Sequence, residues 1–177
     1  MKVAKALLVV LSVIFLTACM SASQGPTPSA KATVDASDNT VRVIQKPVSA
    51  ADNTKKGKNI LGFNWRSTAP EIVMLEVGTQ GNYVKAVHFD IDGNIIQYNT
   101  PESTLTEYAV WSYGTFKMPL AQFRTMANAK VVKMKVIFGT NRYRVTSFGK
   151  AKGNAMVDGK FAPFLEQVDA HLKKLKK

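Results

Sequence analysis

Residues 87–98 read VHFDIDGNIIQY, in which apolar and polar side chains alternate on both sides of Asp92 and Gly93. Alternation with a period of two is typical of a strand that buries one face. An Asp-Gly pair favours a two-residue hairpin turn, because both turn positions need positive φ. Centring the turn there predicts two apolar pairs across the strands: Phe89 with Ile96, and Val87 with Tyr98.

A second hairpin is predicted between residues 130 and 148, where two alternating stretches flank Gly139-Thr140-Asn141. A turn with Thr140 and Asn141 at its tip gives this register: Phe138 opposite Tyr143, and Val136 opposite Val145. The other face of this strand pair then gathers four basic side chains: Lys133, Lys135, Arg142 and Arg144. Four like charges on one strand pair repel unless they are solvated or bound by an anion. We therefore expect these four residues to bind a ligand or partner.

Further strands and two helices are predicted from the rest of the sequence. Apolar patterns indicate strands near residues 41–44, 60–65, 72–77 and 104–118, and helical spacing covers residues 119–129. A last helix carries one apolar stripe: Phe161, Phe164, Leu165, Val168, Leu172 and Leu175. Together they predict an α+β fold: a mostly antiparallel sheet or small sandwich of about six to eight strands, a short internal helix and a C-terminal amphipathic helix.

The last helix ends in a lysine-rich segment, with Lys173, Lys174, Lys176 and Lys177 at its C-terminal end. Cations there are favoured by the helix dipole. The apolar stripe predicts a helix docked on the sheet, with the lysines in solvent. The alternative is a helix at a membrane surface, with the lysines against anionic lipid head groups.

The N-terminal residues have the organisation of an export signal. Lys2 and Lys5 precede an apolar stretch over residues 6–15, which is shorter than the about 20 residues that a spanning helix needs. Residues 1–18 are therefore predicted to be a signal peptide. The closing residues Leu16-Thr17-Ala18-Cys19 resemble the lipobox of bacterial lipoproteins. The alternative is an ordinary signal peptide followed by a chance cysteine.

This resemblance implies a lipid anchor on Cys19. In bacterial lipoproteins the cysteine sulfur receives a diacylglycerol, the peptide is cut before the cysteine, and the new amino group is acylated. Several acyl chains anchor a protein far more firmly than one. The next residue is Met20 rather than Asp, which in Gram-negative sorting implies the outer membrane. The expected location is the cell outer membrane, with the domain facing the periplasm.

Three segments are expected in the chain. Residues 1–18 form the signal peptide, residues 19–40 the lipidated N-terminus with a flexible tether, and residues 41–177 a single globular β-rich domain. The tether is rich in small and polar residues, which bury too little surface to offset chain entropy. A polar, basic loop is expected at residues 53–59.

The chain is strongly basic, with 24 Lys and Arg against 12 Asp and Glu. Removing the leader takes away only Lys2 and Lys5, which leaves 22 basic and 12 acidic residues and a surplus of ten positive charges. Such a surplus favours anionic partners. Lipopolysaccharide, peptidoglycan or an envelope protein fit the expected location, whereas nucleic acid does not.

No catalytic or metal-binding pattern is visible. The sole cysteine is Cys19, so an internal disulfide is excluded, and the two histidines, His88 and His171, stand in no catalytic or metal-ligand spacing. Residues 90–94 share the acidic start of a calcium loop, but the glycine spacing differs and a hairpin turn already explains them. The sequence predicts no enzymatic activity, no cofactor and no metal.

Three functions follow from these features, in order of preference. The first is a non-enzymatic envelope lipoprotein that binds an anionic envelope component or a protein partner. The second is a structural or accessory subunit of an outer-membrane assembly, which would use a sheet edge or the aromatic residues Trp111 and Tyr113. The third is a hydrolytic enzyme, for which no nucleophile or ligand constellation is apparent.

Overall fold

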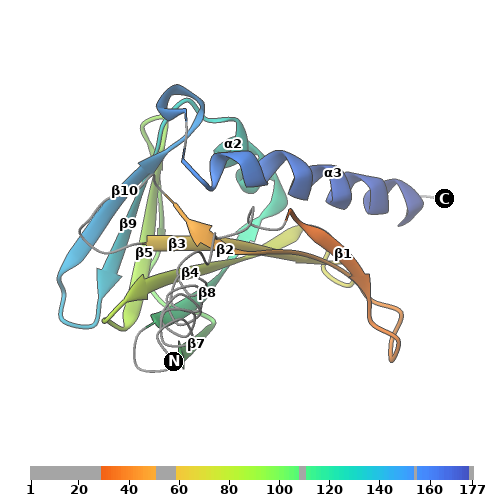
Figure 1. The fold of residues 1–177 in the computed structure, drawn as a ribbon, viewed down its shortest axis with the longest axis horizontal. Helices are drawn as coiled ribbons and strands as arrows, with labels where there is room; N and C mark the ends of the chain where they lie inside the picture. The colour runs from red at the N-terminus through yellow and green to blue at the C-terminus, as the bar shows by residue number, and fades with distance from the viewer. Residues whose placement is uncertain (1–28, 51–58, 108–110, 154, 176–177) are drawn as a thin grey trace, which may run out of the picture.

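The computed structural model describes residues 29–50, 59–107, 111–153 and 155–175. The described chain forms two antiparallel sheets and two α-helices (Figure 1). The predicted leader, the lipobox and most of the loop predicted at 53–59 lie outside these residues. No described helix has both the length and the apolar character needed to cross a bilayer.

The larger sheet has six strands, and every neighbouring pair is antiparallel. In spatial order they are β1 (Lys31–Val34), β2 (Val41–Ser49), β3 (Asn59–Arg66), β4 (Ile72–Gln80), β8 (Trp111–Pro119) and β7 (Ser103–Glu107). As the alternation predicted, one face of β3 is buried through Leu61, Phe63 and Trp65. The central strands of this sheet therefore supply one wall of the core.

The smaller sheet has four strands in the order β10, β9, β5, β6. Their bounds are β5 (Val84–Ile91), β6 (Asn94–Tyr98), β9 (Val132–Phe138) and β10 (Tyr143–Phe148). The predicted register of β5 and β6 is confirmed, because Phe89 pairs with Ile96 and Val87 with Tyr98. Asp92 and Gly93 have φ of 49° and 94°, as the turn requires.

Both predicted helices are confirmed. Helix α2 (Leu120–Asn128) follows β8 directly, and α3 (Asp158–Leu175) lies across one face of the six-stranded sheet (Figure 1). A short 3₁₀ turn, η1 (Lys150–Lys152), precedes α3. Phe161, Phe164 and Val168 of the predicted stripe are buried, whereas Leu175 at its end is exposed. Helix α3 is therefore docked on the protein along most of its stripe.

An aromatic cluster centred on Phe63 joins the helices to the six-stranded sheet. The Phe63 ring lies 4.9 Å from the Phe123 ring of α2, measured between centroids. It lies 4.8 Å and 5.4 Å from the rings of Phe161 and Phe164 in α3. The α+β class with antiparallel pairing is thus confirmed, while the sandwich arrangement stays a prediction. The expected number of strands was too low, because ten are found among the described residues.

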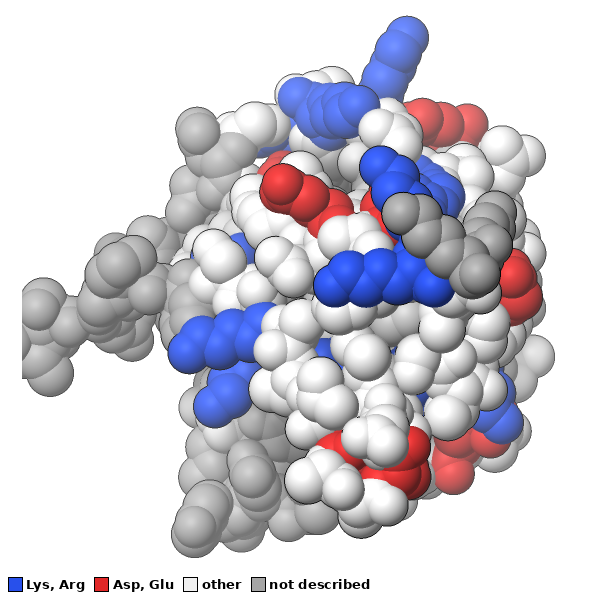
Figure 2. Space-filling model, turned by 90° about the vertical axis from the view of Figure 1, so that its right-hand side faces the viewer, with Lys and Arg blue, Asp and Glu red and all other residues white. Residues whose placement is uncertain are grey.

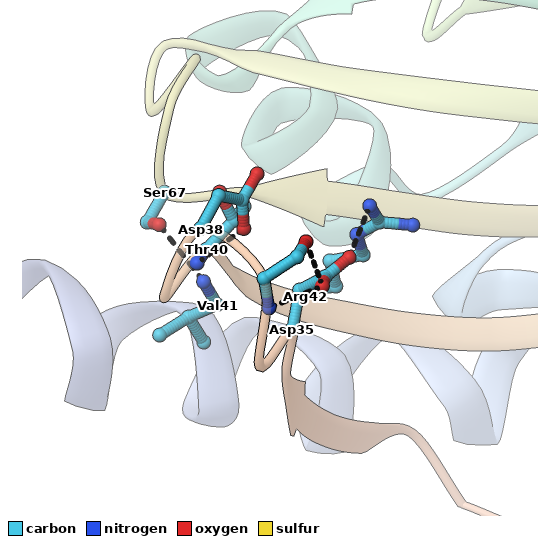
Figure 3. A network of polar contacts seen from close by, with 7 residues as sticks. Asp35, Asp38, Thr40, Val41, Arg42 and Ser67 are labelled. Atoms are coloured by element: carbon cyan, nitrogen blue, oxygen red, sulfur yellow. Dashed lines mark hydrogen bonds and ion pairs between the residues drawn. The ribbon is translucent and has the colours of Figure 1, made fainter.

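The predicted tether is wrong at its C-terminal end, because residues 31–34 form β1 and pair with β2. Polar contacts close the turn between these strands (Figure 3). The Asp35 carboxylate accepts hydrogen bonds from the Ser37 hydroxyl and backbone N–H, which lower its pKa, and forms an ion pair with Arg42 at 2.8 Å. The Ser67 hydroxyl accepts the Val41 N–H at 3.0 Å. These bonds stabilise a strand whose own side chains are exposed.

Replacing Phe63 by Ala should destabilise the protein by about 3–5 kcal/mol, because it removes a buried ring and leaves a cavity between β3 and both helices. Urea unfolding followed by circular dichroism would measure the loss. The exposed Ile95 offers a matched control, since Ile95→Ala removes apolar atoms that already face water. Equal losses in the two variants would show that the aromatic cluster is not the centre of the core.

Candidate binding surface

The β9–β10 hairpin differs from its prediction by one residue. Its loop has three residues, Gly139 to Asn141, because the Phe138 N–H donates to the Arg142 carbonyl at 2.8 Å. Asn141 adopts a φ of 60°, as expected for a type I turn followed by a left-handed residue. Tyr143 consequently pairs with Ile137, and Val145 with Lys135. The predicted pairs, Phe138 with Tyr143 and Val136 with Val145, are wrong.

This shift separates the four basic residues that were predicted to share a face, because moving a register by one residue reverses which faces meet. Lys133 and Lys135 lie on the outer face, since they alternate with buried Val132, Met134 and Val136. Arg144 pairs with Val136 and therefore lies on the core side of β10. Arg142 precedes β10, in the loop region. The four side chains are thus divided between two neighbouring hollows.

The first hollow, which we call the sheet hollow, opens on the outer face of the four-stranded sheet and has a volume of about 330 Å³. It is lined by His88, Asp90, Ile95, Gln97, Lys133, Lys135 and Val145. The ladder explains this grouping, because His88 pairs with Lys135 and Asp90 with Lys133 across β5 and β9. All four strands of the sheet contribute to the hollow.

The two lysines of the sheet hollow differ in their surroundings. The Lys133 ammonium lies 3.2 Å from the Asp90 carboxylate, so its charge is partly neutralised. The Lys135 ammonium lies 4.3 Å above the Tyr143 ring centroid, a cation–π contact that leaves its charge in place. No ion pair of Lys135 is found within 4 Å among the described residues. Lys135 is therefore the stronger attractant for an anion.

The second hollow, which we call the tip pocket, lies at the loop end of the same hairpin and has a volume of about 290 Å³. It is lined by Asn82, Phe138, Arg142, Tyr143 and Arg144. Tyr143 belongs to this lining and also contacts Lys135 of the sheet hollow. The two hollows therefore adjoin at Tyr143. The sequence prediction did not include Asn82 and Tyr143 among the site residues.

Buried polar side chains of the six-stranded sheet hold β10 in position. An Arg144 N–H donates to the Thr79 hydroxyl at 2.9 Å, and the Asn59 amide donates to the Thr146 hydroxyl at 2.9 Å. Both Asn59 and Thr79 are almost fully buried. Their partners lie 65 or more residues away in the chain, so no local sequence signal could indicate these contacts.

Asp92, in the turn between β5 and β6, holds the start of β9 in place through its carboxylate. It accepts the backbone N–H groups of Lys130 and Val131 at 3.0 Å and 2.8 Å, and these bonds lower the pKa of Asp92. The Gly93 N–H donates to the Asp90 carboxylate at 2.9 Å. The acidic residues that resemble the start of a calcium loop thus form hydrogen bonds that stabilise the β5–β6 turn and the start of β9. Among the described residues, no three His, Cys, Asp or Glu side chains gather into a group that could hold a metal ion.

A third hollow of about 270 Å³ lies between α2 and α3, with Met126, Phe161 and Leu165 in its wall. Asp158 also lines it and accepts the Gly149 N–H at 2.9 Å, and burial raises the pKa of its carboxyl group.

His88 lies in the sheet hollow, where its Nε2 is 3.2 Å from the Asn99 side-chain oxygen. His171 lies on α3 with its side chain partly exposed.

The side of the molecule formed by the far ends of α3 and β1 has a different character. Figure 2 shows basic and acidic side chains interspersed there.

In comparisons with protein-family models, curated proteins and solved structures, none matches this chain significantly.

Replacing Asp92 by Asn should reduce the loss of stability on acidification. The folded pKa of Asp92 is lowered, so its stabilising effect is present above the unfolded value of about 3.9 and is lost as the pH falls through the folded pKa. An asparagine does not titrate and lacks this loss. Urea midpoints measured from about pH 5 to about pH 2 should fall less steeply in Asp92→Asn than in the parent.

Asp158→Asn provides a control in which the expected change in acid stability has the opposite sign. The pKa of Asp158 is raised in the folded state, so its contribution to stability increases as the pH falls from the folded pKa toward the unfolded one. The variant lacks this increase and should lose stability more steeply than the parent. Identical acid profiles for the parent and both variants would contradict the assigned roles of these carboxyl groups.

Proposed function

We propose that this chain is a non-enzymatic lipoprotein of the bacterial outer membrane that binds an anionic component of the envelope. The observation that carries the proposal is a pair of adjoining hollows in which Lys135, Arg142 and Arg144 have no carboxylate partner within 4 Å among the described residues. Unneutralised cations in a concave surface raise the local concentration of anions. The phosphates of lipopolysaccharide and the carboxylates of peptidoglycan are envelope anions that such a surface would attract.

The membrane partner in this proposal is the bilayer itself, reached through acyl chains on Cys19. Strand β1 begins at Lys31, so eleven residues separate it from the lipidated cysteine. A fully extended chain of that length spans at most about 40 Å. The domain would therefore remain close to the inner leaflet of the outer membrane while facing the periplasm. Lipopolysaccharide in transit and the peptidoglycan layer are both within the range of such a tether.

A protein partner on the same surface is the second candidate, and the exposure of large apolar side chains favours it. Ile95, Tyr143 and Val145 are 66%, 60% and 49% exposed, and all three lie on the outer face of the four-stranded sheet. Apolar groups gathered on one face are a mark of interaction sites. In this alternative the chain is an accessory subunit of an outer-membrane assembly, and the basic residues select an acidic partner.

The triple variant Lys133→Gln, Lys135→Gln and Arg142→Gln tests the first candidate. Arg144 is left intact because it contacts buried Thr79. Binding to vesicles that contain lipopolysaccharide, and to purified peptidoglycan sacculi, should be measured at low and high salt. For the true ligand the variant should bind about tenfold more weakly at low salt, and the difference should shrink at high salt because mobile ions screen the exposed charges.

A matched control removes three exposed charges from the other side of the molecule: Lys31→Gln, Lys173→Gln and Lys174→Gln. It changes the net charge by the same amount, so it should retain its affinity if binding depends on the hairpin surface. Equal weakening of both triple variants would mean that net charge alone determines binding. Unchanged binding in the hairpin variant would remove that surface as the site.

Replacing Cys19 by Ala tests the anchor. The variant should lack the acyl chains that hold the parent in the bilayer, so in the native host it should be released from membranes or remain as an unprocessed chain. Fractionation and mass spectrometry of the purified chain would report both effects. A parent protein whose N-terminal leader is intact, or whose Cys19 sulfur is unmodified, would overturn the lipoprotein assignment.

A further inference from the structure

We propose that the tip pocket recognises a single phosphoryl group, and that Arg144 is the residue that orients it. This inference rests on the proposed function, because it names the chemical group by which an envelope anion would be recognised. The pocket is formed where the loop after β4 meets the β9–β10 hairpin, and its lining contains two guanidinium groups and no carboxylate. The chemistry is shared by a phosphorylated glycolipid and by free phosphate.

Arg144 is fixed in place before any ligand arrives. One of its N–H groups is bound to the Thr79 hydroxyl, which is fully buried, and its guanidinium carbon lies 5.5 Å from the centroid of the Phe138 ring. A guanidinium has five N–H donors, so four remain for a ligand. Holding the group on one side reduces the side-chain entropy lost on binding. Its planar fork matches two oxygens of a phosphoryl group.

The other residues of the tip pocket add charge and donors around Arg144. Arg142 is exposed at its rim and brings a second cation. The Asn82 amide donates to the Gln80 carbonyl at 3.4 Å, and its second N–H remains as a donor. The lining gives a dianion two cations and no competing acid. A phosphoryl group, which carries nearly two charges at neutral pH, benefits more from this arrangement than a singly charged carboxylate does.

The size of the tip pocket and its connection to the sheet hollow limit the ligand. A volume of about 290 Å³ is at the lower end of the range for small-molecule sites, so it accommodates a compact group rather than a polymer chain. Tyr143 separates this pocket from Lys135 and the sheet hollow. A phosphorylated sugar bound at the tip would therefore extend past Tyr143 toward Lys135. Free phosphate would use the tip alone.

The test uses the full lipidated chain, isotopically labelled and kept in detergent, with inorganic phosphate as the probe and acetate as a carboxylate comparison. Phosphate should shift the amide signals of Asn82 and of residues 138–144, with an affinity on the order of millimolar. Acetate should bind about tenfold more weakly. Arg144→Lys keeps the positive charge but loses the fork, so phosphate affinity should fall by about tenfold.

Two further variants make this result specific. Lys31→Gln with Lys173→Gln removes two exposed charges from the side formed by β1 and α3, so the tip pocket is unchanged and its phosphate affinity should remain within about twofold of the parent. The urea midpoint of Arg144→Lys shows whether the fold survives, and Arg142→Gln gives a second weakened variant that does not depend on the Thr79 contact. Vesicles with phosphorylated or dephosphorylated lipopolysaccharide identify the source: a preference for the former indicates a lipid head group, and equal binding indicates free phosphate.

The inference and the proposed function fail in different ways. If phosphate shifts no tip-pocket signal, or if folded Arg144→Lys binds it as well as the parent does, the phosphoryl site is refuted. Lipopolysaccharide or peptidoglycan binding that still depends on Lys133 and Lys135 would then leave the proposed function intact. If phosphate binds at the tip but neither envelope polymer binds the chain, the site stands and the proposed function falls.

Discussion

Burial of the Phe63 ring is the constraint on which the arrangement of the molecule depends. The ring brings β3 into contact with Phe123 of α2 and with Phe161 and Phe164 of α3, so two helices from distant parts of the sequence cover the same sheet. Both helices are thereby committed to the core, and the cations and apolar side chains on the outer face of the four-stranded sheet stay in solvent. The location of the candidate binding surface therefore follows from the way in which the helices and the six-stranded sheet enclose the core.

The sequence predicted those elements whose signals are local. Asp92 and Gly93 define the β5–β6 turn because their positive φ leaves little choice of register, and both helices follow from their apolar spacing. The β9–β10 register could not be predicted in this way. Gly139, Thr140 and Asn141 are compatible with loops of two or three residues, and the hairpin is also held by side chains of β3 and β4. Strand β1 was missed because it has only four residues and all of its side chains are exposed, so burial leaves little signal in its sequence.

The candidate site illustrates the same limit for charge. The composition shows an excess of basic residues, but which of their charges are neutralised depends on which residues become neighbours in the fold. Lys133 meets Asp90 only because β5 and β9 pair across more than forty residues. Arg144 lies on the core side of its strand, where a hydroxyl and a ring face contact it instead of an acid. Tyr143, which no charge pattern selects, adjoins both hollows.

The position of β1 at the edge of the six-stranded sheet has a mechanical consequence if the chain is attached through Cys19, as proposed. A pulling force on the tether would act first on Lys31, at the end of β1 that pairs with Ile44 of β2. The residue pairs between β1 and β2 would then break one after another and not all together. Four residue pairs and the ion pair between Asp35 and Arg42 resist such peeling, and the side chains of β1 add little burial. Detachment up to Thr40 would lengthen the tether by about 35 Å while the Phe63 cluster stays closed. The first hairpin would then act as an extensible element between bilayer and domain.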